Sequence, residues 1–160
     1  MESLLPTAHA VGELLKARNE TVAIAESSAG GLIAASLLSL PGASKYFIAG
    51  AVVYTLQARR NLLAITDEDM QGLRSSSEPY AALLAERVRE RHGTVWGLSE
   101  TGAAGPTGNR YGDAAGHTCI AVSGPSSAVL TLETELDDRA RNMRLFAARA
   151  LEALHAQLRA

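Results

Sequence analysis

Two segments of the sequence place hydroxyl side chains beside glycines, a combination suited to attacking a carbonyl group and holding the resulting charge. The first, Glu26–Gly31, reads Glu-Ser-Ser-Ala-Gly-Gly and follows a short apolar run. A serine between a strand and a helix faces the positive end of the helix dipole, which favours developing negative charge. The backbone N–H groups of Ala29, Gly30 and Gly31 are suitable donors to an oxyanion or a phosphate. Taken alone, the segment favours ordinary helix capping by a serine.

The second segment is the glycine-rich stretch Ser99–Gly116. Its glycines let the backbone approach a ligand closely, and Arg110 is suited to pair with an anion. The stretch matches neither a Walker loop nor a dinucleotide-binding fingerprint. Because long loops without secondary structure are uncommon in compact domains and are often functional, we expect a binding role here.

Histidine and cysteine are too sparse for metal or thiol chemistry. The four histidines, which are His9, His92, His117 and His155, do not follow metal-ligand spacing. They predict neither a zinc site nor a serine–histidine triad. Cys119 alternates with apolar neighbours and is expected in the core rather than as a nucleophile.

The composition is that of one folded domain. The chain has 160 residues, of which 47% are hydrophobic and 20% charged, with a net charge of −2. Such a chain buries about 70% of its unfolded surface, and its small charge does not attract nucleic acid. Its apolar runs fall short of the ~20 residues that span a bilayer, and its first residues do not resemble a signal peptide. With a single cysteine, we expect a cytoplasmic protein without nucleic-acid or membrane partners.

The hydrophobic pattern predicts strands that alternate with helices along a single domain, residues 1–160. The expected strands are 21–25, 46–54, 94–98, 117–122 and 128–132. The expected helices are 4–18, 30–38, 56–63, 67–73, 77–92, and a last one from 137 or 138 to 158. This alternation indicates a layered α/β domain with a largely parallel sheet and an antiparallel hairpin near its end.

Three polar or glycine-rich segments follow predicted strands, namely Glu26–Gly31, Tyr54–Arg60 and Ser99–Gly116. In sheets of this kind, ligands bind beyond the carboxyl ends of the strands. We therefore expect the chemistry of the protein at these three segments.

Four stretches, taken in order, resemble motifs of the CinA C-terminal domain family, which also occurs alone as the PncC-type nicotinamide-nucleotide amidase. Ala25–Gly31 resembles A-E-S-C-T-G-G, Leu40–Phe47 resembles P-G-S-S-x-x-F, Tyr54–Arg59 lies where Y-S-N-E-A-K is usual, and Thr101–Pro106 resembles [ST]-G-I-A-G-P. Asp138-Arg139 weakly matches the G-D-R that precedes the last helix of the family. The resemblance covers nearly the whole chain, so we expect no counterpart of the amino-terminal domain of full-length CinA within these 160 residues.

The resemblance implies a three-layer α/β/α fold, a homo-oligomer, and deamidation of nicotinamide mononucleotide to nicotinic acid mononucleotide without a metal or other cofactor. By the same resemblance, Ser27 is the expected nucleophile, Tyr54 its hydrogen-bonding partner, and Thr101 a contact near the reacting amide. The residues expected to hold the ribosyl phosphate are Gly102, Gly105 and Arg139.

The sequence departs from the family at the position of its catalytic lysine, which Arg59 occupies. A buried lysine beside a serine loses its proton readily and acts as a general base. Arginine does not do so, because its pKa lies above ~12. Arg59 is instead suited to stabilise an oxyanion, bind phosphate or anchor a salt bridge. The chain has thirteen arginines and only two lysines, so it has almost no spare amine to act as a base.

Three interpretations follow from this departure. The chain is an amidase that uses a substitute base, for which Tyr54, Lys45 and Glu26 are the candidates. Alternatively, it is a binding protein that keeps the pocket and uses Arg59 as a fixed cation for a nucleotide or another anionic ligand. In the third interpretation, the motifs persist only for folding and oligomer contacts.

Overall fold

Five strands form one mixed sheet in the order β2-β1-β3-β4-β5, in a computed structural model that describes residues 1–160. The strands are β1 (Val22–Glu26), β2 (Phe47–Val52), β3 (Trp96–Ala103), β4 (His117–Ser123) and β5 (Ala128–Glu133). β1 pairs in parallel with β2 and β3, whereas β4 pairs antiparallel with both β3 and β5. The carboxyl ends of β1, β2 and β3 and the amino end of β4 therefore share one edge of the sheet.

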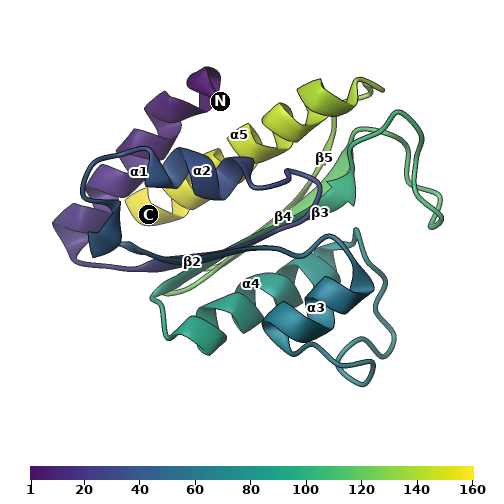
Figure 1. Ribbon diagram of the computed structural model, residues 1–160, viewed down its shortest axis with the longest axis horizontal. Helices are drawn as coiled ribbons and strands as arrows, with labels where there is room; N and C mark the ends of the chain where they lie inside the picture. The colour runs from purple at the N-terminus through teal and green to yellow at the C-terminus, as the bar shows by residue number, and fades with distance from the viewer.

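Helices cover both faces of the sheet and give the three-layer α/β/α architecture (Figure 1). The helices are α1 (Leu5–Arg18), α2 (Leu32–Leu38), α3 (Leu56–Leu63), α4 (Glu78–His92) and α5 (Arg139–Arg159), with short 3₁₀ turns at Glu2–Leu4 and Ala43–Lys45. Figure 1 shows α1, α2 and α5 on one face and α3 and α4 on the other. No helix is both long and apolar enough to cross a membrane.

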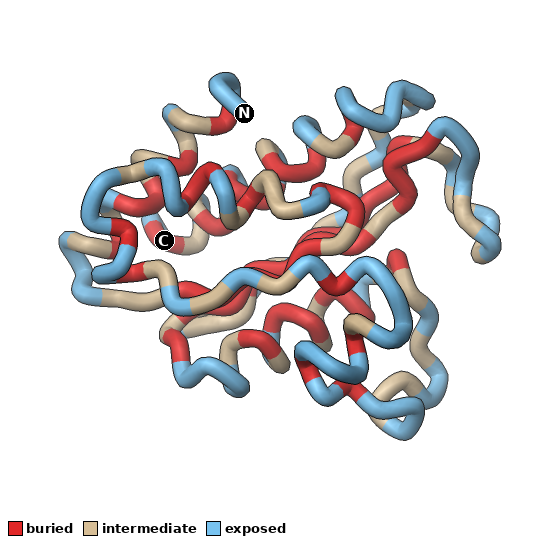
Figure 2. The backbone as a smooth tube through the Cα atoms, viewed as in Figure 1, coloured by how far each residue is buried: buried red, intermediate tan, exposed pale blue.

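The core lies on both sides of the three central strands. β1 is buried along its whole length, and β3 and β4 are buried along nearly all of theirs, because helices cover both of their faces (Figure 2). The outer strands β2 and β5 alternate between half-buried and exposed residues. On α5, Phe146, Ala150, Leu154 and Leu158 are buried, as their helical spacing predicts.

Most predicted elements are confirmed, and two of the helices begin with a side-chain cap. The side chains of Ser77 and Asp138 accept backbone N–H groups at the starts of α4 and α5. The predicted helix over 67–73 is wrong, since this segment forms a series of turns. There the carboxylate of Asp69 accepts the Thr66 N–H at 2.8 Å, and side-chain bonds of this kind compete with helix formation.

β3 extends to Ala103, well past the predicted 94–98. Of the added residues, Ser99, Glu100 and Thr101 are polar, and a polar run after an apolar strand is more typical of a loop. Their polar groups are satisfied inside the protein: the Ser99 hydroxyl donates to the Ala81 carbonyl of α4 at 2.6 Å, and Glu100 accepts several hydrogen bonds. A strand tolerates buried polar side chains when every one of them has a partner.

Candidate active site

The carboxyl edge of the sheet brings together the three segments that the sequence singled out. Ser27, Tyr54 and Thr101 all line one cleft of about 190 Å³. The strand register explains this, because Glu26 of β1 lies opposite the last residue of β2 on one side and opposite Glu100 of β3 on the other. Tyr80, from α4 on the opposite face of the sheet from α2, closes part of the same cleft.

A buried carboxylate holds the turn that carries Ser27. Glu100 is fully buried and accepts the backbone N–H groups of Ser27 at 3.1 Å and Ala29 at 2.8 Å. It also accepts the hydroxyl groups of Ser28 and of Thr118, the latter at 2.8 Å. The Ser27 hydroxyl has no hydrogen bond within the protein. The turn is therefore fixed by its backbone, while its serine hydroxyl faces the cleft.

Glu100 is the site residue that sequence reasoning missed. The available signal was a charged residue between Ser99 and Thr101 in a run that continues an apolar strand. A carboxylate in that position needs several donors to offset its burial. The donors come from the Ser27 turn, which is distant in sequence, so only the strand order places them.

The N–H groups proposed as anion donors are largely used by the protein itself. The Ala29 N–H donates to Glu100, and the Gly30 N–H donates to the Ser27 carbonyl at 3.0 Å. Gly30 and Gly31 have φ values of +68° and +99°, which glycine adopts without strain. The glycines thus shape the turn, and neither they nor Ala29 line the cleft; their role as donors to an anion stays a prediction.

Two of the three candidate substitute bases lie away from Ser27. The Glu26 carboxylate accepts the N–H groups of Ile33 and Ala34, at 3.1 and 3.0 Å, and so caps α2. Burial raises the pKa of Glu26, and the nearby charge of Glu100 adds to this, against the lowering effect of the two N–H groups. Lys45 lies at the amino end of β2, about 16 Å along the sheet from the edge that carries Ser27. Of the three, Tyr54 alone lines the cleft.

A second cavity of about 200 Å³ adjoins the cleft and shares Tyr54 and Gly102 with it. Arg139 of α5 lines this cavity and donates to the Gly105 carbonyl at 2.7 Å and to the Tyr54 hydroxyl at 2.9 Å. A Cβ at Gly102 would lie 2.3 Å from the His117 carbonyl, so backbone packing requires glycine there. The three residues expected at the ribosyl phosphate therefore gather in one cavity beside the expected nucleophile.

Arg59 does not join this group. Its side chain is 6% exposed, and it does not line the cleft that Ser27 and Tyr54 share. Its guanidinium carbon lies 5.9 Å from the centre of the Tyr80 ring, and the nearest carboxylate oxygen, on Asp67, is 3.9 Å away. Burial raises the pKa of Tyr80, and the positive charge of Arg59 opposes that rise. Arg59 therefore reaches the cleft only through Tyr80.

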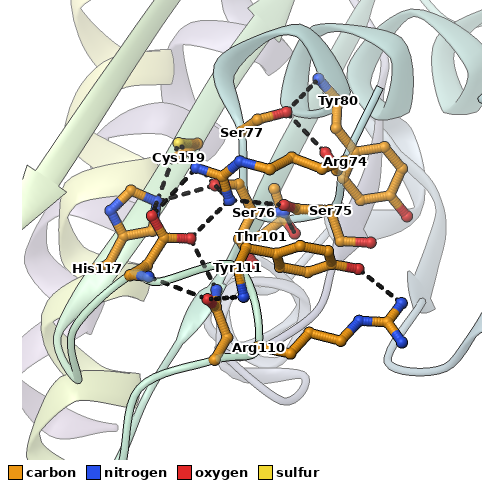
Figure 3. A network of polar contacts seen from close by, with 12 residues as sticks. Arg74, Ser75, Ser76, Ser77, Tyr80, Thr101, Arg110, Tyr111, His117 and Cys119 are labelled. Atoms are coloured by element: carbon orange, nitrogen blue, oxygen red, sulfur yellow. Dashed lines mark hydrogen bonds and ion pairs between the residues drawn. The ribbon is translucent and has the colours of Figure 1, made fainter. Parts of the chain in front are cut away.

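A polar network at the amino end of β4 supports the wall of the cleft (Figure 3). His117 contacts Glu133 of β5 through Nδ1 and the Ser76 carbonyl, 2.9 Å away, through Nε2. Asp113 lies 3.7 Å from the same ring. Burial alone lowers the pKa of His117, but the contacts with Glu133 and Ser76 outweigh it, so the pKa is raised above its usual 6.5. Cys119 is buried beside this network, as expected.

The raised pKa of His117 predicts a pH-dependent stability. The contribution of His117 to the free energy of unfolding is fully present below its unfolded-state pKa of about 6.5. This contribution is lost as the pH rises through the higher folded-state pKa. Glu133→Gln should remove about 1 kcal/mol of unfolding free energy at pH 6 and much less at pH 9. Denaturant unfolding at the two pH values measures this. Glu135→Gln, a neighbouring exposed carboxylate, is the control, and an equal loss at both pH values would contradict the assignment.

No three side chains of His, Cys, Asp or Glu lie together in an arrangement that could hold a metal ion.

The strand order, the helical layers and the cleft at the strand ends define the class of this protein as a three-layer α/β/α domain with its candidate site at the sheet edge. A family model described as the CinA C-terminal domain matches residues 5–158. The chain belongs to this family, which confirms the resemblance of its motifs.

Curated relatives agree with this assignment. A CinA-like protein from Desulfosudis oleivorans is 37% identical over 149 residues, covering 92% of this chain and 36% of the relative. A CinA-like protein from Nostoc sp. is 38% identical over 122 residues, covering 76% of this chain and 29% of the relative. The chain thus spans about a third of the length of these curated relatives.

Solved structures show the same fold. A CinA superfamily protein from Klebsiella pneumoniae has a TM-score of 0.90 at 23% identity, covering 98% of both chains. A competence/damage-inducible protein from Agrobacterium tumefaciens has a TM-score of 0.89 at 24% identity, covering 98% of this chain and 96% of that chain. These matches confirm the mixed sheet and the helical layers.

Proposed function

We propose that this chain is an amidohydrolase that deamidates nicotinamide mononucleotide to nicotinic acid mononucleotide. The observation that carries the proposal is the Ser27 hydroxyl, which lines the cleft without a protein partner on a turn whose backbone is fixed by Glu100. The adjoining cavity with Arg139 suits the ribosyl phosphate. The two compartments match the two ends of the nucleotide, its carboxamide and its phosphate.

In the proposed reaction, the Ser27 oxygen attacks the carboxamide carbon, and ammonia leaves as the acyl-enzyme forms. Water then hydrolyses the ester and releases the carboxylate product and the free serine. Thr101 Oγ1 accepts the Ser76 N–H at 3.3 Å, so its own proton points elsewhere and is available to the oxyanion.

Tyr54 is the proposed proton partner of Ser27. Its oxygen accepts a hydrogen bond from Arg139, which directs its own proton away from Arg139. Tyr54 also lies where the two compartments meet, because it lines both of them. A group at that point is placed to exchange protons with both the serine and the leaving ammonia.

The direct test is ammonia release from nicotinamide mononucleotide by the pure protein, with nicotinamide riboside as the comparison substrate. We expect release from the mononucleotide and a much slower reaction with the riboside, which lacks the phosphate for the Arg139 cavity. An absence of ammonia from the mononucleotide under folded conditions would contradict the proposal.

A second function, nucleotide binding without hydrolysis, is favoured by the position of Arg59. An arginine does not act as a base, and this one lies behind Tyr80 rather than beside Ser27. Calorimetric titration with the mononucleotide separates the two functions from a purely structural role of the motifs. Heat without ammonia supports the binding protein, and neither heat nor ammonia supports the structural role.

Arg59→Lys is expected to change the rate of ammonia release by less than about tenfold, which is below what a general base contributes. The reason is that position 59 faces Tyr80 rather than Ser27, so a lysine amine there does not reach the serine hydroxyl. Arg60→Lys is the matched control, since the Arg60 side chain is exposed and paired with Asp67. A larger rise in rate with Arg59→Lys alone would contradict this and would show that position 59 can supply the base.

We also propose that the chain forms a homo-oligomer. Apolar side chains remain exposed along the outer strand β2 and on α2, namely Ile48, Val52 and Leu38. Exposed apolar groups of this kind are typical of contact surfaces. Sedimentation of the pure protein measures the oligomeric state.

A further inference from the structure

A third cavity, of about 220 Å³, adjoins the cleft on another side. It shares Leu56 and Ser75 with the cleft and no residue with the Arg139 cavity. Three arginines border it, Arg59 from α3, Arg74 from the segment before α4, and Arg110 from the loop between β3 and β4. Three cations from distant parts of the sequence thus face one small space.

Arg59 is the most informative of the three, because it is buried and its only carboxylate contact, with Asp67, is long, at 3.9 Å. Its side chain is 6% exposed, and its Nε is fully buried without a hydrogen bond. The nearest carboxylate, Asp67, is held by Arg60 at 2.6 Å. A buried guanidinium is costly to desolvate unless it is paired. A negatively charged ligand in the cavity that Arg59 borders would supply that pair.

The other two arginines add charge that the protein does not fully neutralise. Arg74 is paired with Asp113 at 2.6 Å. Arg110 contacts no carboxylate and donates only to the Tyr111 hydroxyl, at 2.9 Å (Figure 3). The Arg110 hydrogen bond lowers the pKa of Tyr111 against the effect of burial, and the charges of Arg110 and Arg59 contribute. The cavity therefore has a net positive charge, because Arg110 contacts no carboxylate and Arg59 shares with Arg60 the one carboxylate near it, that of Asp67.

We propose that this cavity is a binding subsite for a small oxyanion of the phosphate or carboxylate class, held by Arg59 and Arg110. Guanidinium groups donate in pairs to two oxygens of such anions, which a lysine does not do. The subsite is separate from the Arg139 cavity and lies on another side of Ser27. It goes beyond the proposed deamidation, because it requires neither hydrolysis nor a nucleotide.

Inorganic phosphate is the probe, and its binding is measured by calorimetry and by the rise in unfolding temperature that a ligand of the folded state produces. The native protein should bind phosphate, and Arg59→Met and Arg110→Gln should each weaken binding at least about tenfold. Arg59→Met replaces a buried charge that has only a long contact with Asp67 by an apolar chain, so we expect no loss of stability. Arg110 is exposed, so its variant should also fold normally.

Two control variants assign the binding to one cavity. Arg144→Gln removes an exposed cation of α5 that is not part of this cavity and should leave phosphate binding unchanged, and so should Arg139→Gln at this subsite. Two results would overturn the proposal: no binding to the native protein at about 10 mM phosphate, or binding lost in Arg139→Gln but kept in Arg59→Met and Arg110→Gln.

The source of the anion is settled by competition in the Arg139→Gln background. If nicotinamide mononucleotide displaces phosphate, the subsite receives an anionic group of the ligand in the cleft. If both bind together, it receives a free anion. Either result keeps the subsite, and neither depends on ammonia release, so failure of the proposed deamidation would leave this test intact.

Discussion

A Ser27→Ala variant should release no measurable ammonia from nicotinamide mononucleotide while unfolding at the same temperature as the native protein. The expected loss is at least about 10³-fold, the scale seen when a nucleophile is removed. The fold should survive because the Ser27 hydroxyl has no partner in the protein. The contacts that hold the turn come from its backbone N–H groups and from Ser28, and these remain.

The matched control for this variant is Ser75→Ala. Ser75 also lines the cleft, so its loss tests for a general effect of removing a hydroxyl there. We expect Ser75→Ala to keep most of the activity. If Ser27→Ala retained activity and Ser75→Ala lost it, the nucleophile would lie on the segment before α4 and the roles inferred from the family would fail.

A Glu100→Gln variant should lose both stability and activity. Glu100 is fully buried and accepts four hydrogen bonds through its two oxygens. An amide presents only one oxygen, so its NH₂ group would face donors that then lack an acceptor. We expect a loss of about 3 kcal/mol of unfolding free energy, since unsatisfied buried polar groups cost about 1–3 kcal/mol each. In a domain of this size, the unfolding temperature should fall by about 6–12 °C.

Activity should fall further than stability explains, because the Ser27 and Ala29 N–H groups lose their common acceptor and the turn can shift. Measuring ammonia release well below the unfolding temperature separates the two effects. Glu152→Gln is the control, since Glu152 is an exposed partner of Arg149 and its loss should change stability by less than about 0.5 kcal/mol. A Glu100→Gln protein as stable and active as the native one would show that the carboxylate does not organise the site.

The local pattern of the sequence was sufficient for most elements of the fold. Strands and helices with clear periodicity, such as α5, form where predicted because burial of one face decides their conformation. The pattern failed where polar side chains determine the structure. At 67–73 a side-chain bond to Asp69 favours turns over helix. In β3, the partners of Ser99 and Glu100 keep polar residues in a buried strand.

The sequence predicts which residues belong to the candidate site, but it does not predict how they are arranged in space. Motif order identified Ser27, Tyr54 and Thr101, which line one cleft. The distance between Arg59 and Ser27 depends on how α3 is oriented against α4, and no local pattern specifies that. The partners of Glu100 depend on strand order in the same way. Sequence reasoning therefore named the residues, and only the tertiary packing separates Arg59 from them.

The carboxylate beneath the Ser27 turn has a consequence for the thermodynamics of ligand binding. β1 is paired on both sides along its length, and the turn that follows it is tied to the neighbouring strand by Glu100. The backbone of the expected nucleophile is therefore preorganised, and no loop has to order when a ligand arrives. Binding then loses little conformational entropy at this point. The conformational entropy of the Ser27 backbone is already lost when the chain folds.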